Sequence, residues 1–239
     1  MSNMKWPAYL VVATAAACGD PSGVVPANGV TVSVIAAPAS QQAVGNGAVE
    51  AVEIDGLRLA LGAVKLETAG LDGMVDYVFA ESRVVEVDLS GEPVTAHTML
   101  DVPVGTYKEI EISIDKLEPG NPAEESLIAA HPTMADASIA ITGRVVQDGS
   151  AASFTFTAAL DRDMEILLDP LLAISGEDEP GGVRVTLTLD TGRWFVDAAG
   201  NRLDPRDPAN RSAIEANIQA SFEAFEDADM DGRPGPIVR

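Results

Sequence analysis

Three aspartates near the end of the chain have the spacing of a calcium loop. Asp227, Asp229 and Asp231 stand at alternate positions in DADMDG, and a glycine follows them. Carboxylate oxygens suit Ca²⁺, and a glycine at the sixth position permits the sharp turn after which the seventh residue, here Arg233, offers its backbone carbonyl. Because three carboxylates in a tight loop repel one another without a cation, the spacing predicts a Ca²⁺ site. The alternative is an acidic, solvated tail.

The first half of this loop resembles an EF-hand calcium loop or the Asp-rich loops of secreted calcium proteins, and its second half departs from the EF-hand. The bidentate glutamate of an EF-hand belongs at the twelfth position, where this chain has Val238. Pro234 and Pro236 do not permit an ordinary exiting helix. We therefore expect weak affinity, about 10⁻⁴ to 10⁻³ M, as in extracellular calcium modules. Further ligands would be water or nearby carboxylates: Glu226, Asp204 and Asp207.

The only cysteine, Cys18, ends an apolar N-terminal segment. Lys5 gives a short positive region, and residues 8–17 are uncharged and apolar, which is typical of a signal peptide. This run is too short to cross a bilayer, because a spanning helix needs about 20 residues. Small residues precede the thiol and Gly19 follows it. The order of these features predicts export, with residues 1–17 as the signal peptide.

The stretch AAACG resembles a bacterial lipobox, in which the position held here by Ala15 is more often leucine. The resemblance implies that Cys18 carries diacylglycerol and becomes the new N-terminus, so the protein would be anchored in the cell envelope. Glycine rather than aspartate after the cysteine favours the outer membrane. Residues 18–29, rich in Gly and Pro, would form the tether. The alternatives are a secretory signal cleaved without lipidation and a buried N-terminal helix.

Trp194 and Phe195 are the aromatic candidates for a binding surface, in a chain that is only 5% aromatic. They stand at the end of a predicted strand. They would either anchor the core and an edge of the sandwich or contact a carbohydrate or peptide ligand. An accessory binding lipoprotein is therefore one alternative function.

Several functional classes are disfavoured by composition and by motifs. With 37 acidic against 15 basic residues the formal charge is −22, which opposes binding to nucleic acid and to a bare anionic membrane. Neither His97 nor His131 has a second histidine at metal-ligand spacing. The nucleophile-elbow, zinc-protease and phosphate-loop motifs are absent from the sequence. We therefore expect a non-enzyme, with a hydrolase that uses paired Asp and Glu as the alternative.

Alternation of apolar and polar residues dominates the chain from residue 30 onward. In residues 183–190, Val and Leu alternate with Arg184, Thr186 and Thr188, which we expect to face outward. The stretch QDGS, residues 147–150, predicts a hairpin between two such runs. About eight short strands with Gly and Pro turns predict a mainly β fold, an antiparallel β-sandwich over residues 30–205. A partly closed barrel is the alternative.

Residues 103–115, PVGTYKEIEISID, resemble the turn-into-strand segment of uncharacterised bacterial lipoproteins with immunoglobulin-like or transthyretin-like sandwiches. The resemblance covers about a dozen residues and supports the fold and the lipoprotein class. It carries over no catalytic residue.

One C-terminal helix is expected over residues 210–227. Ser212 and Glu215 have the spacing of a capping box, and an apolar stripe continues through Ile214, Ile218, Phe222 and Phe225. We expect the helix and the Asp-rich loop, residues 206–239, to pack on the sandwich, although the stripe would also suit a partner protein. A short helix or a loop is expected over 121–132.

Together these features predict a lipid-anchored binding or structural module of the cell envelope. The membrane is its expected partner through the lipid, and a further protein or glycan partner has no identifying motif.

Overall fold

The computed structural model describes residues 29–37, 49–70, 76–99, 102–174 and 183–227. The predicted mainly β fold is confirmed, because the described chain forms three four-stranded sheets consistent with a β-sandwich, and none of these sheets closes into a barrel. Each sheet is named here after one of its central strands. The β1 sheet has the order β12 (Phe222–Glu226), β11 (Val183–Asp190), β1 (Val30–Ala37) and β6 (Val94–Met99). The β7 sheet has the order β10 (Arg162–Ile174), β7 (Gly105–Ile114), β3 (Val64–Thr68) and β4 (Tyr77–Phe79). The β2 sheet has the order β5 (Arg83–Glu86), β2 (Val49–Leu61), β8 (Ile139–Gln147) and β9 (Ser150–Ala158).

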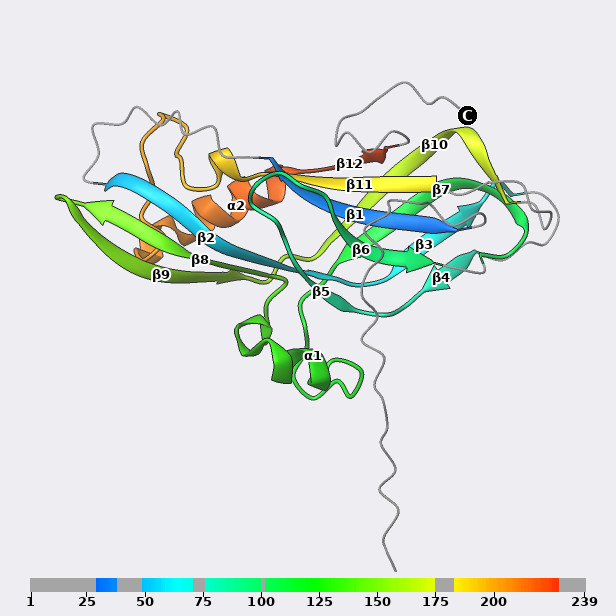
Figure 1. Ribbon diagram of the computed structural model, residues 1–239, viewed down its shortest axis with the longest axis horizontal. Coiled ribbons are helices and arrows are strands. Elements are labelled where there is room, and N and C mark those ends of the chain that lie inside the picture. The colour runs from blue at the N-terminus through cyan, green and yellow to red at the C-terminus, as the bar shows by residue number, and fades with distance from the viewer. Residues whose placement is uncertain (1–28, 38–48, 71–75, 100–101, 175–182, 228–239) are drawn as a thin grey trace, which may run out of the picture.

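Within the described ranges two α-helices accompany the sheets, α1 (Glu125–Ala130) and α2 (Arg211–Ala220). Three short 3₁₀ turns lie at Pro132–Met134, Thr191–Arg193 and Pro208–Asn210. In Figure 1, β1 and β11 lie alongside the strands of the β7 sheet, and α2 lies alongside β8 and β9. Among the described residues, neither helix is long and apolar enough to cross a membrane.

The predicted apolar faces of the strands form one core that joins the three sheets. Val30, Val32 and Val34 of β1 have no exposed surface, and neither have Leu187 and Leu189 of β11. The pairing of β1 with β11 is parallel, whereas the other strand pairs in the described chain are antiparallel. The expectation of an antiparallel sandwich therefore holds with one parallel pair at the centre of the β1 sheet.

The polar face of β11 differs from its prediction. Arg184 is 8% exposed and Thr186 is fully buried, while Thr188 is partly buried. The Thr186 hydroxyl donates to Asp227 Oδ2 at 2.7 Å, so its polar group is satisfied by the residue that follows β12. Alternation reveals which face is apolar, but it does not reveal whether the polar face is also covered. The prediction that these residues face solvent was therefore wrong for Arg184 and Thr186.

The hairpin predicted at residues 147–150 is confirmed between β8 and β9. Gln147 pairs with Ser150, and the two central residues have positive φ, 50° at Asp148 and 69° at Gly149. Positive φ at both positions belongs to the turn whose twist matches antiparallel strands, and Asp-Gly adopts it readily.

The predicted C-terminal helix is present but shorter than expected. Residue 210 is the N-cap and makes no side-chain cap bond, so the capping box does not form; Glu215 instead pairs with Arg211 at 2.9 Å. The helix ends at Ala220, and Phe222 begins β12, where it pairs with Leu189. Here the backbone pairs with β11 at the edge of the β1 sheet instead of continuing the helix, and the apolar stripe alone does not encode that choice. The short helix considered over 121–132 is α1.

Candidate functional site

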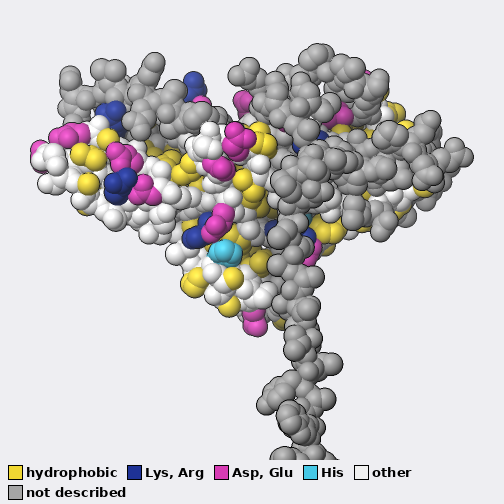
Figure 2. Space-filling model, viewed as in Figure 1, with side chains coloured by type: hydrophobic (Ala, Val, Ile, Leu, Met, Phe, Trp, Pro, Cys, Tyr) yellow, Lys and Arg dark blue, Asp and Glu magenta, His cyan; other side chains and the backbone are white. Residues whose placement is uncertain are grey.

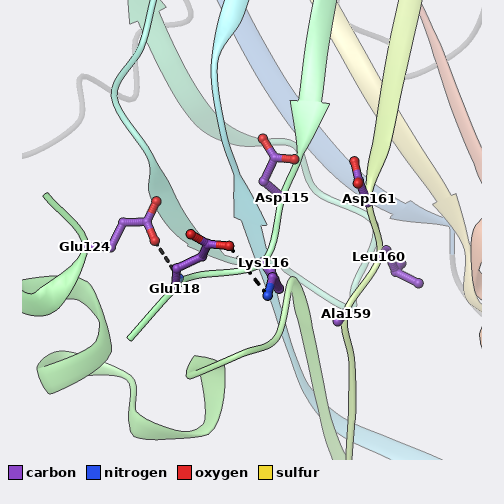
Figure 3. A pocket seen from close by; sticks show the side chains of 7 residues that line it. All are labelled: Asp115, Lys116, Glu118, Glu124, Ala159, Leu160 and Asp161. Carbon is purple, nitrogen blue, oxygen red and sulfur yellow. Dashed lines mark hydrogen bonds and ion pairs between the residues drawn. The ribbon is translucent and has the colours of Figure 1, made fainter. Parts of the chain in front are cut away.

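An acidic cavity of about 500 Å³ opens where β7 ends and β10 begins (Figure 3). Ile114 pairs with Arg162 across these antiparallel strands, so Asp115 and Asp161 follow at adjoining strand ends. The cavity is lined by Asp115, Lys116, Glu118, Glu124, Ala159, Leu160 and Asp161.

The carboxylates of this cavity act on one another. Asp115 and Asp161 are exposed side chains, and the partial desolvation of Asp115 raises its pKa. The negative charges of Asp161, Asp163 and Glu124 raise it further. Lys116 is the cation among the lining residues, and its Nζ lies 3.5 Å from the carboxylate of Glu118. The interior of the cavity is therefore acidic and favours a positively charged guest.

Glu124 holds one wall of the cavity in place. Its Oε2 accepts a hydrogen bond from the Glu118 backbone N–H at 2.6 Å, and its Oε1 accepts one from the Ser82 hydroxyl at 3.2 Å. Only 9% of Glu124 is exposed. Because both oxygens are engaged, Glu124 positions the chain that carries Lys116 and Glu118 and is a structural carboxylate.

A small separate core fixes the segment between β7 and β8 on the outside of the β2 sheet. Leu117 and Met134 are buried together with Ala60 and Ala140 of the sheet, and Leu117 forms a bridge with Ala135. Two residues of α1, Leu127 and Ile128, pack on this cluster. The acidic residues therefore stand on an anchored segment and not on a free loop.

Two chemical uses fit the acidic cavity. A carboxyl of raised pKa beside a second carboxyl is the arrangement that serves general acid and base catalysis on glycosides. Binding of an organic cation needs only the negative field. In the described part of the chain there is no group of three or more His, Cys, Asp or Glu side chains that could hold a metal ion.

The sequence analysis did not predict this site. Asp115 and Asp161 are 46 positions apart, and only strand pairing brings them together.

The predicted calcium loop is described only at its first residue. Asp227 is 2% exposed, its N–H donates to the Arg184 carbonyl at 3.0 Å, and its Oδ2 accepts from Thr186. Burial lowers the pKa of Arg184, and the charge of Asp227 opposes this shift, which indicates that the two charged groups are close. Three of the four predicted ligands lie outside the described residues: Asp229, Asp231 and Arg233.

Two of the three additional ligands considered for calcium, Asp204 and Asp207, are bound to other groups. Asp204 forms an ion pair with Arg206 at 2.6 Å, which with its hydrogen bonds lowers the pKa of Asp204. Asp207 accepts a hydrogen bond from the Ala209 backbone at 2.9 Å and caps a 3₁₀ turn. Glu226 is the last residue of β12 and directly precedes Asp227. Of these three, Glu226 is therefore the one that the sequence places beside the Asp-rich loop.

Trp194 and Phe195 do not offer a ligand surface. Trp194 has no exposed area and donates from Nε1 to Ser221 Oγ at 2.7 Å. Phe195 is 5% exposed and makes edge-to-face contacts with Phe154 and Phe156, with ring centres 5.6 and 6.4 Å apart. Trp194 therefore packs at the end of α2 and Phe195 packs on β9 of the β2 sheet, so both serve as core anchors, which was the alternative to ligand contact.

The predicted lipidation site, Cys18, lies outside the described residues, as do the predicted signal peptide and nearly all of the tether. On the face shown in Figure 2, Asp and Glu side chains are dispersed among Lys and Arg. Acidic and basic side chains also form ion pairs in the described chain, such as Arg58 with Glu86 at 2.8 Å.

Comparison of the chain with models of protein families, with curated proteins and with solved structures gives no match.

Proposed function

We propose that this chain is a lipid-anchored module of the cell envelope that acts by binding or by structural support and not by catalysis. The observation that carries the proposal is the order of segments in the sequence: an apolar export signal, Cys18 in a lipobox-like stretch, and a Gly- and Pro-rich tether to residue 29. The first strand of the sandwich, β1, begins at Val30, directly after this tether. Two or three acyl chains on Cys18 would anchor the protein stably, whereas one chain binds reversibly.

The anchor is tested by expressing the full chain in a Gram-negative host and feeding a clickable fatty acid. The parent is expected to take up the label and to sediment with outer membranes, whereas Cys18→Ser loses both properties. Ala15→Leu is the matched control, because it brings the stretch closer to the usual lipobox and is expected to keep the label. An unlabelled parent released as a free protein would refute the anchor and favour a simple secretory signal.

Calcium binding by the loop at residues 227–232 is a second component of the proposal. Its support is the Asp-Xaa-Asp-Xaa-Asp-Gly spacing, together with a first aspartate held at the end of β12 by its bond to the Arg184 carbonyl. The other predicted ligands are Asp229, Asp231 and the carbonyl of Arg233. A Kd of about 1 mM would stabilise the native state by about 1.4 kcal/mol in about 10 mM Ca²⁺.

Thermal unfolding of residues 19–239 with Ca²⁺ and with chelator tests this component. The parent and Glu92→Ala, an exposed acid elsewhere, are expected to melt higher in Ca²⁺. Asp231→Ala is expected to melt at the same temperature in both conditions. Equal shifts in all three proteins would place any Ca²⁺ effect outside the loop.

A hydrolase is the second candidate function, and the acidic cavity is the observation that favours it. Asp115, with its raised pKa, would act as the acid and Asp161 as the base or nucleophile. A panel of aryl glycosides at pH 4–6 tests this candidate. Turnover that disappears in Asp115→Asn but persists in Asp163→Asn would establish catalysis in the cavity, and the absence of turnover in the parent leaves the binding module.

A further inference from the structure

His97 of β6 is a buried imidazole without a polar partner. The residue has no exposed surface, and neither ring nitrogen makes a hydrogen bond to any residue that the structure describes. A neutral imidazole has both a donor and an acceptor, and burying them unpaired is costly. A protonated imidazole has two donors and a full charge, so burying it unpaired costs still more.

His97 lies where β6 contacts strands of the two other sheets, so the cost of burying its imidazole acts on the contact between sheets. Strands β4, β5 and β6 are edge strands of three different sheets, and β6 contacts β4 through Phe79 and β5 through Arg83 next to this ring. Phe79 of β4 packs edge-on against the imidazole, with ring centres 5.5 Å apart and an interplanar angle of 77°. From β5, Arg83 Nη1 donates to the carbonyl of Ala96, the residue next to His97, at 3.4 Å.

Burial and the charge of Arg83 oppose the protonation of His97. Burial lowers its pKa to about 4, and the positive charge of Arg83 contributes to the shift. Glu81 acts in the opposite direction, but its carboxylate is bound to Arg83 at 3.1 Å. On the other side of β6, Val32 of β1 pairs with His97, and β4 faces it with Phe79. From the elements described around the ring, the charged groups that act on it are therefore Arg83 and Glu81.

We propose that His97 makes the contact of β6 with β4 and β5 a pH-sensitive junction, which is closed while the imidazole is neutral and opens when acid protonates it. Protonation sets an imidazolium against the Arg83 guanidinium at the point where this arginine ties β5 to the Ala96 carbonyl. Opening of β6 lets the imidazolium reach water and relieves the repulsion. The apolar contact with Phe79 is lost in the same step. The device does not depend on the lipid anchor or on calcium.

The sign of the pH effect follows from the direction of the pKa shift. The unfolded or opened state has an ordinary histidine pKa of about 6.5 and binds the proton first. The contribution of neutral His97 to the stability of the closed junction is therefore fully present above about pH 6.5, and it is lost as the pH falls toward the closed-state pKa of about 4. Between pH 7.5 and 4.5 the opening equilibrium constant attributable to His97 rises about 70-fold.

The test compares urea unfolding of the full chain in detergent at pH 7.5 and 4.5 for the parent, His97→Phe and His131→Phe. Phenylalanine keeps the ring next to Phe79 and cannot take a proton, and His131 is the other histidine of the chain. Between pH 7.5 and 4.5 the folding equilibrium constant of the parent and of His131→Phe is expected to fall about 70-fold more than that of His97→Phe. The same loss in all three proteins would overturn the proposal.

Two further measurements decide the question even if His97→Phe does not fold. The NMR titration of the parent imidazole is expected to give a His97 pKa below 5, and a value near 6.5 with β6 still protected would overturn the proposal. Amide hydrogen exchange, corrected for intrinsic rates, is expected to accelerate at pH 4.5 in β6 and β5 before it does in β9. Uniform acceleration across all strands would indicate general acid unfolding and would refute a local junction.

Discussion

Removing the carboxylate of Glu124 is expected to release one wall of the acidic cavity and to destabilise the fold. In Glu124→Ala the Glu118 backbone N–H loses a 2.6 Å bond to a charged acceptor, and the Ser82 hydroxyl loses its 3.2 Å partner. A bond to a charged group contributes about 1.5–3 kcal/mol, and the hydroxyl can turn to water at little cost. We therefore expect a loss of about 2–3 kcal/mol in the free energy of unfolding.

Urea unfolding at pH 7, followed by circular dichroism, measures this loss as a lower midpoint at constant slope. Glu118→Ala is the matched control, because its exposed side chain pairs with Lys116 and surface pairs of this kind contribute about 0–1 kcal/mol. Hydrogen exchange is expected to show faster opening of residues 115–124 in Glu124→Ala. If the two variants lost equal stability, the inference that Glu124 positions the cavity wall would be refuted.

Two further substitutions test the sheet and the electrostatics. The methyl group of Gly143→Ala would overlap the backbone oxygen of Glu53 on β2. We therefore expect this variant to lose about 3 kcal/mol in the free energy of unfolding, measured with urea. A loss below about 1 kcal/mol would contradict this close approach of the two strands. Arg206→Gln removes the partner that lowers the pKa of Asp204. The stability from a lowered carboxyl pKa is complete above the unfolded value near 4 and is lost as the pH falls through the lowered value. Thermal unfolding should therefore show the parent more stable than the variant at pH 7, with a difference that narrows as the pH falls below 4. A gap between parent and variant that stayed constant with pH would show that Arg206 acts through packing.

Local patterns in the sequence predicted about eight strands, whereas the described residues form twelve, and these patterns did not predict which strands pair. The Asp148-Gly149 turn encodes its own geometry, so the β8–β9 hairpin could be predicted from four residues. The parallel pairing of β1 with β11 joins residues about 150 positions apart, and no local pattern specifies it. The order of strands in each sheet is set by such long-range contacts.

The C-terminal segment shows how tertiary pairing overrides a local pattern. Ile214, Ile218 and Phe222 have helical spacing, and all three are buried, but the third is buried as a strand residue. Ser221 stands at the change: its hydroxyl donates to the Ile218 carbonyl and accepts from Trp194 Nε1. The burial of Trp194 therefore depends on the same residue that follows the last turn of α2.

The burial of Trp194 and Phe195 also changes which ligands suit the protein. An accessory binder that stacks sugars needs an exposed aromatic face, and these two rings lie in the core. The acidic cavity offers carboxylates instead, with Lys116 as the cation among its lining residues, and that cation is already paired with Glu118. A guest there must bring positive charge to compensate Asp115 and Asp161. Protonation of Asp115, whose pKa is raised, would lower this demand, so a cationic guest should bind more weakly as the pH falls toward that pKa. A hydrolase using the same pair would instead gain its acid in that range, so the pH dependence separates the two uses of one site.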